Sequence, residues 1–123
     1  MYRLGIERDF IARHYLIGGD FGDENFEHSH HYRVEVLVAG TEIDEHGYLI
    51  DLVELERVLG GVIGEFRERL LNELEPFRGL NPSLEHFARI LWERLRESLP
   101  FAGRMTVKLW ENERDWASYG NVP

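Results

Sequence analysis

Cysteine is absent from this chain of 123 residues. Its absence excludes disulfides, thiolate metal ligands, iron–sulfur clusters and a cysteine nucleophile. Basic residues are few, with 14 Lys and Arg against 23 Asp and Glu, so the formal net charge is −9 at pH 7. Non-specific nucleic-acid binding depends on neutralising phosphates, and anionic membranes repel acidic proteins. We therefore expect neither nucleic acid nor a membrane as a partner.

Long hydrophobic runs are also missing, since no segment approaches the roughly 18 apolar residues that a membrane-spanning helix needs. The N-terminus carries charges from Arg3 onward and shows no signal-peptide core, so we expect a cytoplasmic protein. Hydrophobic residues make up 43% of the chain and aromatic residues 12%, enough to build a core and exclude general disorder. The length predicts a single domain over residues 1–123.

Alternating apolar and polar residues predict two long strands, over residues 2–16 and 28–39. In the first strand, one face carries apolar side chains: Tyr2, Leu4, Ile6, Phe10, Ala12 and Leu16. In the second strand, Val34, Val36 and Val38 alternate with Arg33 and Glu35. We expect an antiparallel pair with one apolar face.

Two helices and two further strands follow. Asp51 is a predicted N-cap, with Glu54 completing a capping box, and apolar residues continue at helical spacing as far as Leu70. A second helix is predicted to begin at Ser83 and end near Pro100, before strands at 104–111 and 115–120. The order ββααββ predicts an α+β fold, with two helices on one face of an antiparallel sheet.

Three histidines can converge in such a sheet. His28 and His30 lie on the same side of one strand, about 7 Å apart. His14 lies on the apolar face of the other strand, and a turn near residues 18–23 brings it opposite them. Three imidazoles without thiolates suit Zn²⁺ or another divalent transition metal, with a fourth coordination position left open. The alternative is a half-exposed polar pair beside a buried His14 that has a hydrogen-bond partner.

The sequence resembles the 6-pyruvoyltetrahydropterin synthase family, which includes the 6-carboxytetrahydropterin synthases of queuosine biosynthesis. The resemblance covers nearly the whole chain and rests on motifs that occur in the family's order. They are Phe10-Ile11-Ala12-Arg13-His14, His28-Ser29-His30-His31-Tyr32, Gly47 to Asp51-Leu52, Leu71-Asn72 with Asn81-Pro82-Ser83-Leu84-Glu85, and Glu111 with Ala117-Ser118-Tyr119.

This resemblance implies the tunnelling fold, and homotrimers whose sheets close a barrel and usually pair into hexamers. It implies a zinc-dependent lyase that acts on a dihydropterin such as 7,8-dihydroneopterin triphosphate. Zinc would be bound by His14, His28 and His30. Glu111 would bind the pterin through paired hydrogen bonds, and Ser83 would help to seat it. The alternatives are an ordinary strand-end carboxylate for Glu111 and a helix N-cap for Ser83.

The departures from the family pattern fall on residues that move protons. Glu24 stands where many relatives have a cysteine, and Arg67 and Glu68 stand where an Asp-His pair is expected. One hypothesis is a lyase in which Glu24 is the base and the side chain is cleaved to give 6-hydroxymethyl-7,8-dihydropterin, a folate precursor. Asp23 and Glu27 are nearby alternatives to Glu24. The second hypothesis is a non-catalytic homologue that binds zinc and a pterin but has lost synthase activity.

Overall fold

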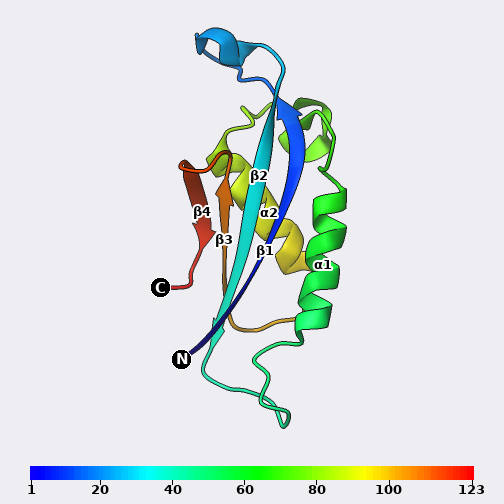
Figure 1. Cartoon of the computed structure of the whole chain (residues 1–123), viewed down its shortest axis with the longest axis vertical. Coiled ribbons are helices and arrows are strands. Elements are labelled where there is room, and N and C mark those ends of the chain that lie inside the picture. Colours follow the sequence, from blue (N-terminus) through cyan, green and yellow to red (C-terminus); the bar gives the residue numbers. More distant parts are fainter.

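Four antiparallel strands form one sheet in the order β1-β2-β3-β4 in the computed structural model, which describes residues 1–123. Helices α1 (Leu52–Gly64) and α2 (Leu84–Ser98) connect β2 to β3 and cover one face of the sheet (Figure 1). The strands are β1 (Tyr2–His14), β2 (His28–Gly40), β3 (Arg104–Trp110) and β4 (Trp116–Gly120). Short 3-10 helices lie at η1 (Gly22–Asn25), η2 (Leu71–Glu73) and η3 (Glu75–Phe77). The predicted α+β fold and ββααββ order are confirmed.

The long β1–β2 ladder determines which side chains share a face. It runs from Tyr2 opposite Gly40 to His14 opposite His28. β1 ends two residues before the predicted boundary, because beyond His14 the backbone bonds to residues outside the sheet instead of to β2. The backbone N–H of Tyr15, for example, donates to Asn72 Oδ1 at 3.0 Å.

Both predicted N-caps are present. The Asp51 carboxylate accepts a hydrogen bond from the Val53 backbone N–H at 2.9 Å. The Ser83 hydroxyl accepts one from the backbone N–H of His86 at 3.1 Å. The capping box predicted at Glu54 does not form, because the Glu54 carboxylate instead binds the Arg57 guanidinium, one helical turn further on.

Helix α1 ends at Gly64 and does not continue to Leu70 as the apolar spacing predicted. The chain turns after Gly64, and Glu68 adopts a left-handed conformation with φ of 60°. Its backbone N–H donates to the Ile11 carbonyl at 2.7 Å. Apolar residues in the turn still reach the core, since Phe66 is fully buried. The spacing therefore indicated burial correctly but misplaced the end of the helix.

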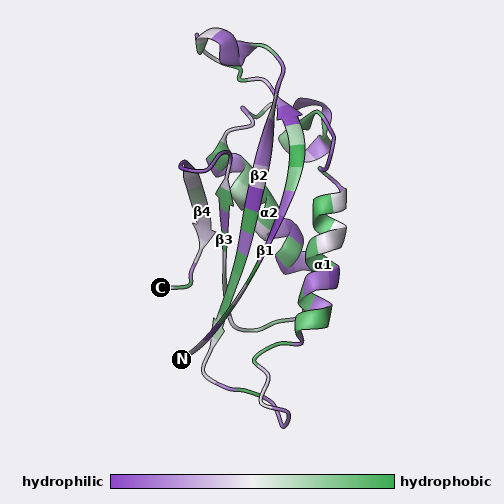
Figure 2. Ribbon diagram, in the orientation of Figure 1, coloured by the Kyte–Doolittle hydropathy of each residue, from purple (hydrophilic) through white to green (hydrophobic).

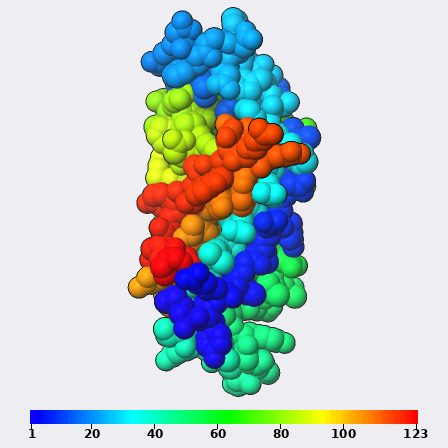
Figure 3. All heavy atoms as spheres, turned by 60° about the vertical axis from the view of Figure 1, so that its left-hand side comes forward, coloured from blue at the N-terminus to red at the C-terminus, as the bar shows by residue number.

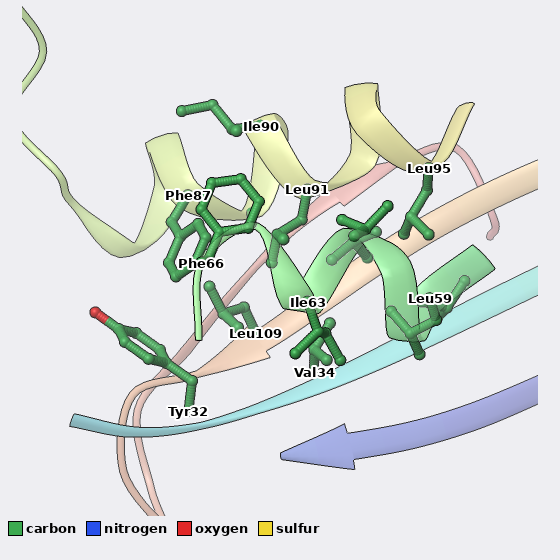
Figure 4. Close-up of a cluster of buried hydrophobic side chains, with 14 of the residues drawn as sticks. Tyr32, Val34, Leu59, Ile63, Phe66, Phe87, Ile90, Leu91, Leu95 and Leu109 are labelled. Atoms are coloured by element: carbon green, nitrogen blue, oxygen red, sulfur yellow. The ribbon is translucent and has the colours of Figure 1, made fainter. Parts of the chain in front are cut away.

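The core lies between the sheet and the two helices, where 24 buried apolar residues form one cluster (Figure 4). Figure 2 shows hydrophobic and hydrophilic residues alternating along β2, as a strand with one buried face requires. Each fully buried Leu, Ile or Phe side chain contributes about 1.5–3 kcal/mol relative to exposure. No helix has the length and apolar character needed to cross a membrane.

The opposite face of the sheet is polar and aromatic. The Arg33 guanidinium lies 4.0 Å from the centre of the Trp110 ring, and the Lys108 ammonium lies 4.0 Å from that of Trp116. Such cation–π contacts let charged side chains cover aromatic surface. Figure 3 shows the segment around residues 15–27 at the end of the molecule remote from the N-terminus. The histidines border this segment.

Candidate metal and substrate site

His14, His28 and His30 meet on the helix-facing side of the sheet, at the end of the β1–β2 ladder. Their ligand atoms all lie within 4.8 Å of one another. The ladder places His14 opposite His28 and Ala12 opposite His30, so the three rings form a triangle with centroids 4.6 to 4.9 Å apart. The structure therefore brings together all three of the histidines that the strand pattern singled out.

Backbone carbonyls determine which nitrogen of two of these rings carries the proton. His14 Nδ1 donates to the Pro82 carbonyl at 2.9 Å, and His28 Nδ1 donates to the Phe26 carbonyl at 2.8 Å. A neutral imidazole has one N–H, so both Nε2 atoms carry lone pairs. Metal-binding histidines commonly have a carbonyl on the second ring nitrogen, which orients the ring and sets its tautomer.

The two Nε2 atoms lie only 3.0 Å apart. Two lone pairs at this distance repel each other, whereas a cation between them satisfies both. Nitrogens bound to a tetrahedral zinc ion at about 2.0–2.1 Å are roughly 3.3 Å from one another. The spacing and the all-imidazole donor set thus fit a divalent transition metal such as Zn²⁺.

Burial favours the neutral form of His14 and His30. It lowers the pKa of His14 to about 4, with further lowering from His30 and His28 and an opposing effect from the bond to Pro82. Burial also lowers the pKa of His30, and the charge of His28 acts in the same direction. Neutral imidazole is the form that binds a metal, so burial prepares the site for an ion at neutral pH.

Two carboxylates accompany the histidines. Glu111 follows β3 directly, and its Oε2 lies 4.0 Å from His30 Nε2. Burial raises the pKa of the Glu111 carboxyl, and the charges of Glu24, Asp115 and Glu85 raise it further. The charge of Glu24 also opposes the lowering of the pKa of His30. Glu24 therefore lies within electrostatic reach of both His30 and Glu111.

The two nearby alternatives to Glu24 lack this connection. Glu27 is engaged by Arg13, whose Nη1 lies 2.8 Å from Glu27 Oε2. Asp23 is exposed in η1, as Glu24 is, and its charge does not contribute to the pKa shift of His14 or His30. Among the three candidates Asp23, Glu24 and Glu27, only the charge of Glu24 contributes to the pKa shift of His30.

Other predicted residues lie close to the site or outside it. Ser83 caps α2 and directly follows Pro82, whose carbonyl binds His14. Arg67 and Glu68 lie in the exposed turn beside the edge of β1, where the Glu68 backbone bonds to Ile11. Neither of these two residues takes the place of a proton-transfer pair at the histidines.

Sequence reasoning missed part of the surroundings of His14. The Tyr32 hydroxyl lies 3.4 Å from His14 Nδ1, and burial raises the pKa of this phenol above its usual value. Its position two residues after His30, on the same face of the strand, was an available signal. The role of Pro82 had no such signal, because its carbonyl reaches His14 across 68 positions of sequence.

The fold and the histidine cluster define a class of small α+β proteins, and residues 3–121 match the family model described as 6-pyruvoyl tetrahydropterin synthase. The chain belongs to this family. It is 36% identical to a dihydroneopterin monophosphate aldolase of Pyrococcus furiosus over 85 residues, 68% of this chain and 69% of that protein. It is 28% identical to a 6-carboxy-5,6,7,8-tetrahydropterin synthase of Bacillus subtilis over 102 residues, 80% of this chain and 68% of that protein. These names support a lyase-type enzyme.

Solved structures of the family share the fold. The 6-pyruvoyl tetrahydropterin synthase of Caenorhabditis elegans superposes with a TM-score of 0.85 at 24% identity, covering 99% of this chain and 98% of that one. A Plasmodium vivax synthase superposes with a TM-score of 0.81 at 19% identity, covering 98% and 97%. In that Plasmodium structure, a glutamate described as a catalytic residue is replaced by alanine.

Proposed function

We propose that this protein is a zinc-dependent lyase of the aldolase type that cleaves the side chain of a phosphorylated 7,8-dihydroneopterin. The products are 6-hydroxymethyl-7,8-dihydropterin and the phosphorylated two-carbon aldehyde. The single observation that carries this proposal is the pair of Nε2 atoms of His14 and His28, 3.0 Å apart with both Nδ1 atoms bonded to carbonyls. That arrangement supports a metal site, and the kinship with an aldolase acting on dihydroneopterin monophosphate supports the reaction.

A metal ion bound by the three imidazoles would supply Lewis acidity toward the side-chain hydroxyls of the substrate. Glu24 is the proposed base, because its charge reaches His30 and Glu111 and no cysteine is available. It removes the proton from the hydroxyl on the second side-chain carbon. The bond between the first and second carbons then breaks, and the second carbon becomes an aldehyde. The released electron pair passes to the first carbon and the conjugated ring, and a proton returned to that carbon completes the hydroxymethyl group.

Glu111 is the proposed pterin anchor. A carboxylate can accept two parallel hydrogen bonds from the amino and ring N–H groups at the edge of the pterin. Its carboxylate points toward His30 in the structure, at 4.0 Å. The amino edge of a pterin lies opposite its side chain, so binding this edge requires Glu111 to turn away from the histidines. Ser83 is the proposed second contact to the pterin, because it directly follows Pro82, whose carbonyl binds His14.

We also propose that the protein works as a homo-oligomer, a trimer or a hexamer. β1 and β4 are the two edges of the sheet. Apart from residues 11–13 of β1, which bond to residues 68–70, their outer backbone groups have no partner strand in a single chain. Edges of this kind are usually covered or paired. Pairing between neighbouring copies would join the sheets and place their polar faces inside the assembly.

Incubation of the zinc-loaded protein with 7,8-dihydroneopterin monophosphate, and separately with the triphosphate, tests the reaction. Chromatography should show 6-hydroxymethyl-7,8-dihydropterin, with none formed after the metal is removed with a chelator. The competing hypothesis is a homologue that binds zinc and a pterin without catalysis. Tight binding of either substrate, with the substrate recovered intact, would support that alternative.

A further inference from the structure

The segment that follows α1 runs beside the free edge of β1 and bonds to it like a short parallel strand. The Glu68 backbone N–H donates to the Ile11 carbonyl at 2.7 Å, and the Arg13 N–H donates to the Arg69 carbonyl at 2.9 Å. Directly after these contacts, Arg13 and Leu70 form a parallel bridge. This pairing advances along β1 toward His14, and it ends where the chain turns into η2.

The Asn72 side chain continues the pairing where the backbone turns away. Its Oδ1 accepts from the Tyr15 N–H at 3.0 Å, and its Nδ2 donates to the Tyr15 carbonyl at 2.9 Å. One amide thus binds both polar groups of a single residue, as a neighbouring strand would. The β1–β2 ladder ends at His14, so this contact lies just beyond the last residue that β2 holds.

His14 is therefore held from two sides. Its ring is oriented by the Pro82 carbonyl at 2.9 Å, and the backbone directly after it is clamped by Asn72. Two residues after Tyr15, a second asparagine also binds the backbone, because the Ile17 N–H donates to Asn81 Oδ1 at 2.8 Å. Metal ligands must be kept within about 0.5 Å of their productive positions, and this depends on the groups that support them.

We infer that Asn72 is a positioning residue for His14, acting through the backbone of Tyr15 to keep the imidazole at the histidine cluster. This inference rests on the proposed function only in that the cluster binds a metal. Removing a supporting group behind a metal ligand typically weakens metal affinity by about 10–100-fold. The amide of Asn72 touches neither the metal position nor the substrate, so its effect should appear first in metal binding.

The test compares Asn72→Ala and Asn72→Asp with the control Asn121→Ala. Asn121 Oδ1 likewise bonds to a backbone N–H, that of Met105 at 3.1 Å, but at the opposite end of the sheet from His14. The aspartate variant keeps the acceptor for Tyr15 N–H and turns the other oxygen toward the Tyr15 carbonyl. Zinc affinity is measured by chelator competition, and ligand geometry by the visible absorption of the cobalt-loaded protein.

Both Asn72 variants should bind zinc about 10–100-fold more weakly than the wild type and show an altered cobalt spectrum, while Asn121→Ala matches the wild type. Folded Asn72 variants with unchanged zinc affinity and cobalt spectrum would overturn the inference. If the alanine variant does not fold, the zinc affinity and cobalt spectrum of the nearly isosteric Asn72→Asp variant provide the test. Because this experiment does not measure turnover, unchanged zinc affinity in the Asn72 variants would not contradict the proposed reaction. Conversely, a zinc-loaded wild type that leaves the pterin intact refutes the reaction and not the role of Asn72.

Discussion

His14 Nε2 and His28 Nε2 lie 3.0 Å apart, and each ring donates its other nitrogen to a backbone carbonyl. While both rings are neutral, they therefore cannot form a hydrogen bond with each other without giving up a bond to the backbone. Two separate loops, one ending at Phe26 and one ending at Pro82, impose this arrangement. The two Nε2 lone pairs therefore repel each other unless a cation lies between them.

Replacing His14, His28 or His30 by alanine should abolish tight binding of one zinc ion per chain, because two imidazoles alone hold the ion weakly. Elemental analysis of the dialysed protein measures the metal content. His31→Ala is the matched control, since His31 directly follows His30 but points to the other face and pairs with Asp9 at 2.6 Å. A full equivalent of zinc in any of the three variants would refute that residue's assignment.

Glu24→Gln should lower kcat by about 10²–10⁴-fold, the usual contribution of a general base, while zinc content stays at the wild-type level. Product formation from 7,8-dihydroneopterin monophosphate is the measurement. Glu27→Gln serves as the control, because Glu27 is held by Arg13 at 2.8 Å and should keep its turnover. Equal turnover in the Glu24→Gln variant and the wild type would show that another group moves the proton.

Glu111→Ala should weaken pterin binding by about 10–100-fold, because hydrogen bonds to a charged group contribute about 1.5–3 kcal/mol. Calorimetric titration with a non-reactive pterin tests this, and zinc content should not change. Glu113→Ala, an exposed carboxylate in the same turn, should bind the pterin like the wild type. Retained affinity in Glu111→Ala would place the pterin anchor elsewhere.

The metal-free protein should lose stability as the pH falls below neutrality. The pKa of His14 is lowered from 6.5 to about 4 in the folded state, so between these values the unfolded chain binds the extra proton. This contribution is absent above pH 6.5 and grows to roughly 3 kcal/mol of destabilisation near pH 4. Urea unfolding at pH 7 and pH 5 measures the change, and His14→Phe should reduce the difference between the two pH values. An unchanged difference in that variant would mean that other groups cause the pH dependence.

Local patterns in the sequence predicted most of the fold because each depends on near neighbours. Alternation along residues 28–39 predicted β2, and the capping residues Asp51 and Ser83 predicted where the helices begin. The end of α1 was misplaced because Phe66 continues the helical spacing of buried residues from within a turn. Apolar spacing reports which side chains are buried and does not distinguish a helix from a turn that packs on the same core.

The sequence by itself determined that His28 and His30 share a face and that His14 belongs to the apolar side of its strand, because side-chain direction alternates along any strand. Only the tertiary structure decided what surrounds them. The Pro82 carbonyl, the Asn72 amide and the carboxylates of Glu24 and Glu111 come from four separate segments. Their positions depend on how the helices pack against the sheet and where the loops end, which no spacing along the chain encodes.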